Sequence, residues 1–353
     1  HEVTTFRRDF NTDGRHAEVE FGVSLHDDLA RRDFTINAMA WHPIEQRLED
    51  PFGGREDLDG ALVRAVGVAE DRFHEDRLRA LRAIRFAARF GFAIEPETWS
   101  AIKSSAPHMG RLSAERVKQE LEKTMEQVLR PSHALRLWQA SGAFQTLVPA
   151  LATMPERNLL AVDALALPGP ATRPARRTLR FAALFAAVES RALVGVLKTM
   201  KFSNAEMTAI VALAGDWNAI GGAIGARLLA AADLPDRDVR RWVARVGRLR
   251  VASFSRLAVA MWWADGNLGN AAPPPPAWRA LHRQMLEIAF RDPLESSDLA
   301  IDGDDLRRIG VTPGPVMGRV LHALTELVLE DPTRNSVEAL TIEARRLASE
   351  LSA

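Results

Sequence analysis

The feature that most constrains the fold is a change of hydrophobic periodicity near residue 68. Before that point, short runs at 1–6, 36–41 and 62–66 have the pattern and composition of β-strands. From Asp71 onward the apolar residues recur every three or four positions, which predicts helices. The chain is therefore expected to be α+β, with every strand before about residue 68 and helices after it.

Turn and cap residues divide these segments further. The polar stretch 7–20 is predicted to be a loop, and 48–54 a turn that closes a small hairpin. Gly91 is expected to end the first long helix, and Ser113 to cap a later one. The proline-rich stretches 168–174 and 273–276 are predicted to be loops.

Composition limits the class of protein. A chain of 353 residues with 47% hydrophobic residues can bury a sizeable core, and the absence of cysteine excludes disulfides and thiolate metal sites. No window approaches the eighteen or more apolar residues of a membrane helix. We therefore expect a cytoplasmic protein without a membrane partner. The 46 basic and 46 acidic side chains cancel, so only local clusters can indicate a polyanionic partner, and the sequence leaves monomer and homodimer open.

A first polar cluster is Glu-Asp-x-x-Arg-x-x-Arg at 75–82. If this segment is helical, Asp76 and Arg79 lie side by side on one face while Leu78 and Leu81 face inward. A carboxylate can accept from the exocyclic amine of cytosine or adenine, and a guanidinium can donate to the neighbouring ring nitrogen. Guanine and uracil present the opposite groups, so the pair would select C and A. The alternative is a set of exposed ion pairs, each contributing only about 0.2–0.5 kcal/mol.

A second cluster is Arg-Arg-Asp-Phe-Thr-Ile-Asn-Ala at 31–38. A guanidinium matches phosphate oxygens with two donors, and Asp33 and Asn37 are placed so that both could reach ribose hydroxyls. Together the two clusters indicate a nucleotide pocket. A helix start with chance ion pairs is the alternative for this segment taken alone.

Two further motifs follow in order with these clusters, namely Asp50–Gly54 and Arg-Leu-Ser-x-Glu-Arg at 111–116. With these four motifs in this order, the chain strongly resembles the class II tRNA nucleotidyltransferases (CCA-adding enzymes) and the related bacterial poly(A) polymerases. Residues 301–318 fit the same family, so the resemblance spans most of the chain. It implies a nucleotidyltransferase-type β-sheet head at 1–67, a helical neck at 68–128 that recognises the base, a helical body at 129–235 and a helical, tRNA-binding tail at 236–353.

The resemblance also implies roles for individual residues. Arg32, Asp33 and Asn37 would hold the ribose and triphosphate. Asp76 and Arg79 would recognise the base, supported by Glu75 and Arg82, while Ser113, Glu115 and Arg116 would brace the base-recognising helix. Asp50, Gly53 and Gly54 would form a hinge between head and neck that lets one pocket accept first CTP and then ATP.

One family feature is not found among these residues, namely the Gly-Gly…Arg-Asp turn at the start of the head, which is followed by the Asp-x-Asp pair that binds Mg²⁺. Two metal ions would activate the primer's 3′ hydroxyl and neutralise charge at the α-phosphate. The resemblance places those ligands upstream of His1, so the head is expected to be incomplete, and this chain alone is expected to bind CTP or ATP weakly and to transfer nothing. Glu2 is the one candidate among these residues for a supporting catalytic carboxylate, and an ordinary strand residue is its alternative.

Arginine clusters elsewhere are candidates for contacts to tRNA phosphates. The stretch 237–250 includes Arg240, Arg241, Arg245 and Arg248, and a helix face paired with Asp236 and Asp238 is equally compatible with it. A weaker cluster is Arg173, Arg176, Arg177 and Arg180.

The expected function is addition of C, C and A to the tRNA 3′ end from CTP and ATP, with release of pyrophosphate. A poly(A) polymerase, a CC-only or A-only enzyme, and a non-catalytic RNA-binding relic are the alternatives.

Overall fold

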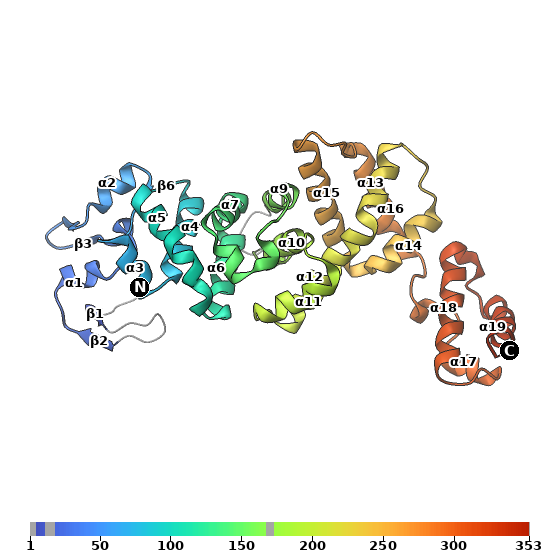
Figure 1. Cartoon of the computed structure of the whole chain (residues 1–353). Helices are drawn as coiled ribbons and strands as arrows, with labels where there is room; N and C mark the ends of the chain where they lie inside the picture. Colours follow the sequence, from blue (N-terminus) through green and yellow to red (C-terminus); the bar gives the residue numbers. More distant parts are fainter. Residues whose placement is uncertain (1–4, 11–17, 167–172, 353) are drawn as a thin grey trace. The chain divides into compact units, whose positions relative to one another are not determined.

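The computed structural model describes residues 5–10, 18–166 and 173–352, and its contacts divide the chain into two units, residues 1–211 and 212–353. Figure 1 colours the first unit from blue to yellow-green and the second from there to red. The predicted α+β class, with strands near the N-terminal end and helices beyond, is confirmed. The finer division into head, neck, body and tail stays a prediction.

The strands are short and pair two by two. The antiparallel hairpins are β1 (Arg7–Phe10) with β2 (Glu18–Phe21) and β3 (Ala40–His42) with β4 (Arg47–Glu49), and β5 (Leu62–Val63) pairs in parallel with β6 (Ala93–Ile94). The predicted loop at 7–20 is wrong at both ends, which are strands, and the expectation that all strands precede residue 68 is wrong because of β6. Residues 43–46, and not 48–54, connect β3 to β4.

Short helices carry the chain between these strands. They are α1 (Leu25–Ala30), the 3₁₀ turn η1 (Thr35–Asn37) and α2 (Gly54–Asp59). Ser24 caps α1, accepting a hydrogen bond from the Asp27 amide at 3.1 Å. Phe34, just before η1, is fully buried and forms a β-bridge with Ala65. This bridge fixes the backbone of the Arg-Arg-Asp segment against the strand region.

The next four helices are α3 (Ala69–Glu75), α4 (Leu78–Phe90), α5 (Pro96–Ser105) and α6 (Ala114–Gln127). Leu81 and Ile84 on α4 are fully buried, as the periodicity predicted. Gly91 ends α4 in the left-handed conformation with φ 71°, and Ser113 caps α6, so both predicted helix boundaries are confirmed. The 3₁₀ segment η2 (Ala106–Arg111) links α5 to α6.

The rest of the first unit is helical. Its elements are α7 (Pro131–Ser141), α8 (Ala143–Leu147), α9 (Glu156–Ala164), α10 (Arg173–Phe185), α11 (Ser190–Thr199) and the first part of α12 (Asn204–Asp216). Most of the predicted loop at 168–174 lies outside the described residues. Phe181 and Phe185 of α10 are buried and meet Phe202 edge to face, which ties α10 to the segment before α12.

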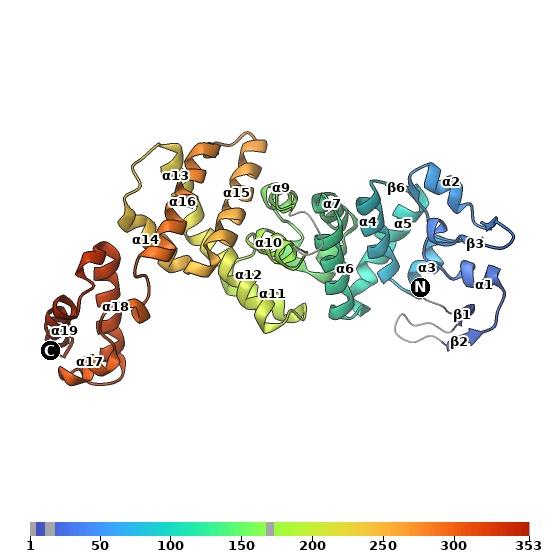
Figure 2. The same ribbon diagram turned by 180° about the vertical axis from the view of Figure 1, so that it is seen from behind.

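The second unit contains α13 (Gly222–Leu229), α14 (Asp236–Val246), α15 (Val251–Asn267), α16 (Pro275–Arg291), α17 (Gly303–Arg308), α18 (Pro315–Glu330) and α19 (Val337–Ser352). Figure 2 shows the same helices from behind. Leu306, Leu324 and Leu340 centre a core shared by α17, α18 and α19. The predicted loop at 273–276 is partly wrong, because Pro275 and Pro276 form the first turn of α16, where a missing amide proton costs nothing.

One continuous helical run, Asn204–Leu229, has the length and apolar composition needed to cross a membrane, and 44% of its apolar eighteen-residue stretch is buried. The sequence expectation that no segment is apolar over such a length is therefore corrected. Within the second unit, Trp217 of this run meets the ring of Trp262 on α15, and Ile224 is fully buried. These contacts pack part of the run against the protein interior of the second unit.

Candidate functional site

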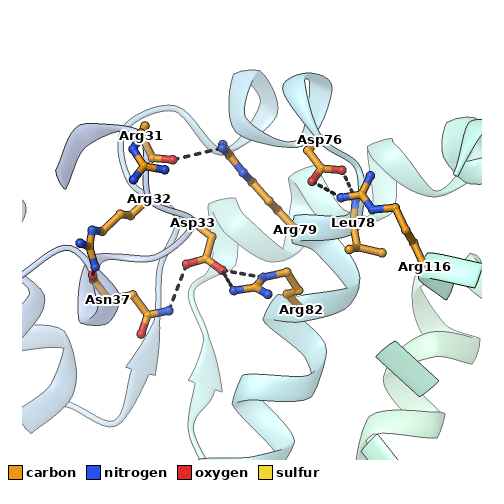
Figure 3. Close-up of a pocket in the computed structure, with 9 residues that line it drawn as sticks. All are labelled: Arg31, Arg32, Asp33, Asn37, Asp76, Leu78, Arg79, Arg82 and Arg116. Carbon is orange, nitrogen blue, oxygen red and sulfur yellow. Dashed lines mark hydrogen bonds and ion pairs between the residues drawn. The ribbon is translucent and has the colours of Figure 1, made fainter. Parts of the chain in front are cut away.

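An open pocket of about 820 Å³ lies in the first unit, where the segment after α1 faces the junction of α3 and α4 (Figure 3). It is lined by Arg31, Arg32, Asp33, Asn37, Asp76, Leu78, Arg79, Arg82 and Arg116. All the predicted nucleotide-binding residues except Glu75 are in this lining. The two polar clusters of the sequence therefore meet in one cavity.

Asp33 is the centre of the first half of the pocket. Its Oδ1 accepts from the Asn37 side-chain amide at 3.0 Å, and its Oδ2 accepts from Arg82 Nε at 2.7 Å. The Val66 amide donates to the Asp33 carbonyl at 3.3 Å, which holds the backbone. These bonds join a loop residue, a 3₁₀ turn and helix α4, so the Asp33 carboxylate is fixed before any ligand arrives.

The second half differs from the sequence expectation. Asp76 does not lie on a helix, because its backbone is extended (φ −147°, ψ 104°) in the break between α3 and α4. Its carboxylate accepts from Arg116 at 2.6 Å and from the Leu78 amide at 3.1 Å. The expected side-by-side pairing of Asp76 with Arg79 on one helical turn is therefore wrong, although both side chains line the same pocket.

Arg79 has different partners. One of its terminal nitrogens donates to Glu75 at 2.8 Å and the other to the Arg31 carbonyl at 3.1 Å. Glu75 thus supports Arg79 from outside the pocket lining. The Arg31 carbonyl connects Arg79 to the opposite wall, as Figure 3 shows.

Arg116 and Asp28 were not among the predicted nucleotide-binding residues. Arg116 was expected only to brace, and it both bonds to Asp76 and lines the pocket. Asp28, which is 4% exposed, accepts from Arg31 at 2.9 Å and from Arg32 at 3.1 Å. The spacing of three and four residues from Asp28 to the two arginines is a signal in the sequence that would have identified it.

The pocket has a strongly positive lining. Its charged residues are Arg31, Arg32, Asp33, Asp76, Arg79, Arg82 and Arg116, which leaves an excess of three positive charges in the lining, or of one when the partner carboxylates of Asp28 and Glu75 are counted. Each of the arginines is also held by a carboxylate, so their guanidinium groups are oriented in advance. An anionic ligand would meet fixed donors, which suits a phosphate group.

Family profiles match three parts of the chain. They are described as the Poly A polymerase head domain (residues 1–64), the Probable RNA and SrmB-binding site of polymerase A (residues 91–154) and the tRNA nucleotidyltransferase domain 2 (residues 275–344). The pocket is built from the first two regions and the residues between them.

Relatives cover nearly the whole chain. The CCA-adding enzyme of Geobacillus stearothermophilus is 32% identical over 348 residues, which is 96% of this chain and 77% of the relative. That of Latilactobacillus sakei is 32% identical over 350 residues, covering 98% and 79%. The chain belongs to the CCA-adding enzyme family. Its resemblance to nucleotidyltransferases, inferred from the motifs, is thereby confirmed.

Solved structures of the family agree with the fold. The crystal structure of the Bacillus stearothermophilus CCA-adding enzyme in complex with CTP aligns at a TM-score of 0.70 and 32% identity, over 99% of this chain and 80% of that one. The Thermotoga maritima CCA-adding enzyme complexed with tRNA has the same fold at a TM-score of 0.57 and 24% identity, over 93% and 74%.

The predicted hinge residues form the N-terminal cap of α2. Asp50 accepts from the Gly54 amide at 2.6 Å and from the Arg55 amide at 2.9 Å, and Gly53 has a positive φ of 73°. Gly54 lies against η1, because an added Cβ would be 2.2 Å from the Thr35 carbonyl oxygen. The hinge itself stays a prediction.

The arginines of α14 and the turn after it have internal partners. Arg240 is 6% exposed and donates to Asp292 at 3.1 Å and to the Leu329 and Glu330 carbonyls, so burial weighs against its predicted contact with tRNA. Arg248 bonds to Asp298 and to the Ala289 carbonyl. Arg241 and Arg245 are about half exposed and pair with Glu330 and Asp216.

Arg180 of the weaker arginine cluster has a structural role. Arg180 is 1% exposed and donates to the Met125, Val128 and Leu129 carbonyls at the C-terminal end of α6. Burial lowers the pKa of Arg180 to about 10, and the nearby Arg176 adds to the shift. Such a guanidinium satisfies helix-end carbonyls and cannot reach an external phosphate.

Proposed function

We propose that this chain adds C, C and A to the 3′ end of tRNA, using CTP and ATP and releasing pyrophosphate. The observation that carries the proposal is the pocket in which Asp76 and Arg79 face an arginine-rich wall. The CTP complex of a relative that is 32% identical over most of this chain supports the same ligand class.

Recognition of the base is assigned to Asp76 and Arg79. The carboxylate would accept from the exocyclic amine shared by C and A, and the guanidinium would donate to the adjacent ring nitrogen. Arg116 donates to Asp76, and Arg79 donates to Glu75. The Asp76 carboxylate can still accept further hydrogen bonds, and the Arg79 guanidinium can still donate them. A base with the opposite pattern would leave both unpaired, at about 1–3 kcal/mol for each group.

The triphosphate and ribose are assigned to the opposite wall. Arg32, whose side chain is 42% exposed, offers a guanidinium to phosphate oxygens. Asn37 uses its amide nitrogen on Asp33, so its side-chain oxygen is the group that would meet a ribose hydroxyl. Asp33 is bonded to Asn37 and Arg82 and would act chiefly by orienting them.

Magnesium belongs to this proposal only through the family resemblance. Among the described residues, no group of three or more histidine or acidic side chains could hold a metal ion. The carboxylates of Asp33 and Asp76 are bonded to Arg82 and Arg116, so they do not fit as its ligands. Glu2, the predicted supporting carboxylate, lies outside the described residues. The roles assigned to the pocket residues are therefore binding and orientation of the nucleotide.

The remaining parts of the proposal concern RNA and location. The match at 91–154 to a region described as RNA-binding supports a role of the helices after α4 in holding the tRNA. The proposal also includes the division of the chain into head, neck, body and tail at the predicted boundaries. A cytoplasmic location, where CTP, ATP and tRNA are available together, completes it.

A bacterial poly(A) polymerase is the second candidate, because residues 1–64 match the head domain of that enzyme. The two functions differ in the nucleotides they use. A poly(A) polymerase would extend RNA from ATP alone, whereas a CCA-adding enzyme needs CTP first.

The first test is equilibrium binding of the four ribonucleoside triphosphates to the 353-residue chain. We expect CTP and ATP to bind at least about tenfold more tightly than UTP and GTP, given the cost of unpaired polar groups. Equal affinity for all four would overturn the assignment of the pocket. Transfer is then tested on the chain joined to a head segment that carries Asp-x-Asp. Addition of C, C and A supports the proposal, and extension with ATP alone supports the polymerase.

A further inference from the structure

A second cavity, of about 410 Å³, lies on another side of the α3–α4 junction. It is enclosed by α3, the link after it, α5 and η2, all within the first unit. Its lining residues are Glu70, Phe73, His74, Arg77, Ala101, Ser104, Ser105, His108 and Arg111. None of them lines the nucleotide pocket, and the sequence motifs predicted a ligand for none of them.

The two arginines of this cavity differ from those of the nucleotide pocket. In the part of the chain that the structure describes, neither Arg77 nor Arg111 forms an ion pair with a carboxylate. Arg77 has one side-chain bond, to the hydroxyl of the buried Ser105 at 3.3 Å. The pocket arginines, by contrast, all have acidic partners.

Among the described residues, neither guanidinium group in this cavity is therefore neutralised by a paired carboxylate. Burial lowers the pKa of Arg77, and repulsion from Arg111 lowers it further. Glu70 is the one acidic residue of the lining, and two histidines and two serines add hydrogen-bonding groups. An anion bound between the guanidinium groups would relieve their repulsion and satisfy their donors.

We propose that the cavity between Arg77 and Arg111 binds a phosphate group of an RNA backbone, namely that of the tRNA required by the proposed function, on which this inference rests. Guanidinium forks and serine hydroxyls are the donors that proteins use for phosphate oxygens. His74, Ser104, His108 and Arg111 are exposed, so a polymer can pass over the cavity without being enclosed.

The position of Arg77 gives such a contact a function. Arg77 directly follows Asp76, so two consecutive residues of the α3–α4 link line different cavities. A backbone phosphate held by Arg77 and Arg111 would fix the RNA relative to the group that selects the incoming base. Free pyrophosphate has the same chemistry as a ligand, and the test separates the two sources.

The experiment uses the 353-residue chain and two variants of the cavity. Arg111→Gln removes one guanidinium, and Ser104→Asp adds a negative charge at an exposed position with no side-chain bond to lose. Their matched controls are Lys103→Gln and Ser100→Asp, which make the same changes in charge at exposed positions of α5 outside the cavity. Affinity for tRNA lacking its 3′ CCA is measured across a range of salt concentrations.

We expect Arg111→Gln to weaken tRNA binding by about five- to tenfold and to reduce the slope of log K against log salt by about one. Ser104→Asp should weaken binding at least as much. Both controls should bind tRNA like the unaltered chain, and affinity for CTP should be unchanged in all four variants.

Two results would overturn the inference while leaving the proposed function intact. One is an affinity for tRNA that is the same in both cavity variants as in their controls. The other is a loss of pyrophosphate binding, measured by calorimetry, without a loss of tRNA binding, since it would identify the free anion as the ligand. Failure of the unaltered chain to bind either CTP or tRNA would instead count against the proposed function.

Discussion

Asp76 is bonded to Arg116 and to the Leu78 amide, so its carboxylate is held in one orientation toward the pocket. We expect Asp76→Asn to reduce the preference for CTP and ATP over UTP and GTP by about fivefold or more, because the amide presents a donor as well as an acceptor. Competition binding with the four triphosphates measures this change. The matched control is Asp71→Asn, an exposed position of α3 that does not line the pocket. An unchanged preference would contradict the role of Asp76.

At the residue scale, the sequence predicted which side chains share the pocket better than it predicted their partners. Asp33 and Arg82 were both expected there, and they form an ion pair of 2.7 Å. Asp76 was expected to pair with Arg79 along a helix, but it pairs with Arg116, forty residues away. Local spacing cannot rank such partners, because the choice depends on how α6 packs against α4.

At the scale of elements, the close packing of α2 at the predicted hinge can be tested by substitution of Gly54. An added Cβ on Gly54 would lie 2.2 Å from the Thr35 carbonyl oxygen and 2.8 Å from Met39 Cγ. We expect Gly54→Ala to lower the free energy of unfolding by about 1–3 kcal/mol through overpacking. Gly195→Ala is the control, because nothing lies within 4 Å of its added Cβ on α11 and the change should stabilise the helix. Thermal unfolding of both variants measures the difference, and equal stability would refute the close packing.

The start of α12 has a titrating contact with α6. Burial alone would raise the pKa of Glu206, but bonds from Lys118 and Ser203 outweigh it and lower the pKa to about 2, against an ordinary 4.5. A lowered pKa gives stability that is complete above pH 4.5 and is lost as the pH falls toward 2. We expect Glu206→Gln to lower stability at about pH 7 and to flatten its decline over that range. Urea unfolding at several pH values measures this, and an unaltered decline would refute it.

Elements with a strong local signal were predicted and those without one were not. Gly91 and Ser113 mark helix ends through their own backbone and side-chain chemistry, independent of the rest of the fold. β6 is two residues long and exists because it pairs with β5, which lies well before it in the chain. Its sequence carries no alternation long enough to identify it.

For the whole molecule, the order of strands and helices follows from periodicity, whereas the division into units does not. The boundary at 211/212 falls inside α12, and the helical run continues through Trp217 without a break. Composition and loop signals cannot mark such a boundary, since it depends on which core each helix face joins. Because each unit has its own internal contacts, we expect a substitution within one unit to leave ligand binding by the other intact.

Arg240 allows that separation to be tested. Its guanidinium is buried in the second unit with Asp292 and two backbone carbonyls, and removing one partner of a buried pair costs about 3–5 kcal/mol. Asp292 keeps a bond to Arg291 at 2.6 Å, so we expect Arg240→Met to cost toward the lower end of that range. Scanning calorimetry should show a less stable second unit, while CTP binding by the first unit is unchanged.

The control is Arg237→Met on the same helix, whose side chain is 56% exposed and whose loss should cost less than about 1 kcal/mol. If Arg240 instead contacted tRNA, its replacement would leave the unfolding temperature unchanged and lower the salt dependence of tRNA binding by about one unit of slope. The two roles therefore predict opposite results. A guanidinium enclosed by Asp292 and helix-end carbonyls stabilises the second unit, and the same enclosure keeps it from reaching a phosphate.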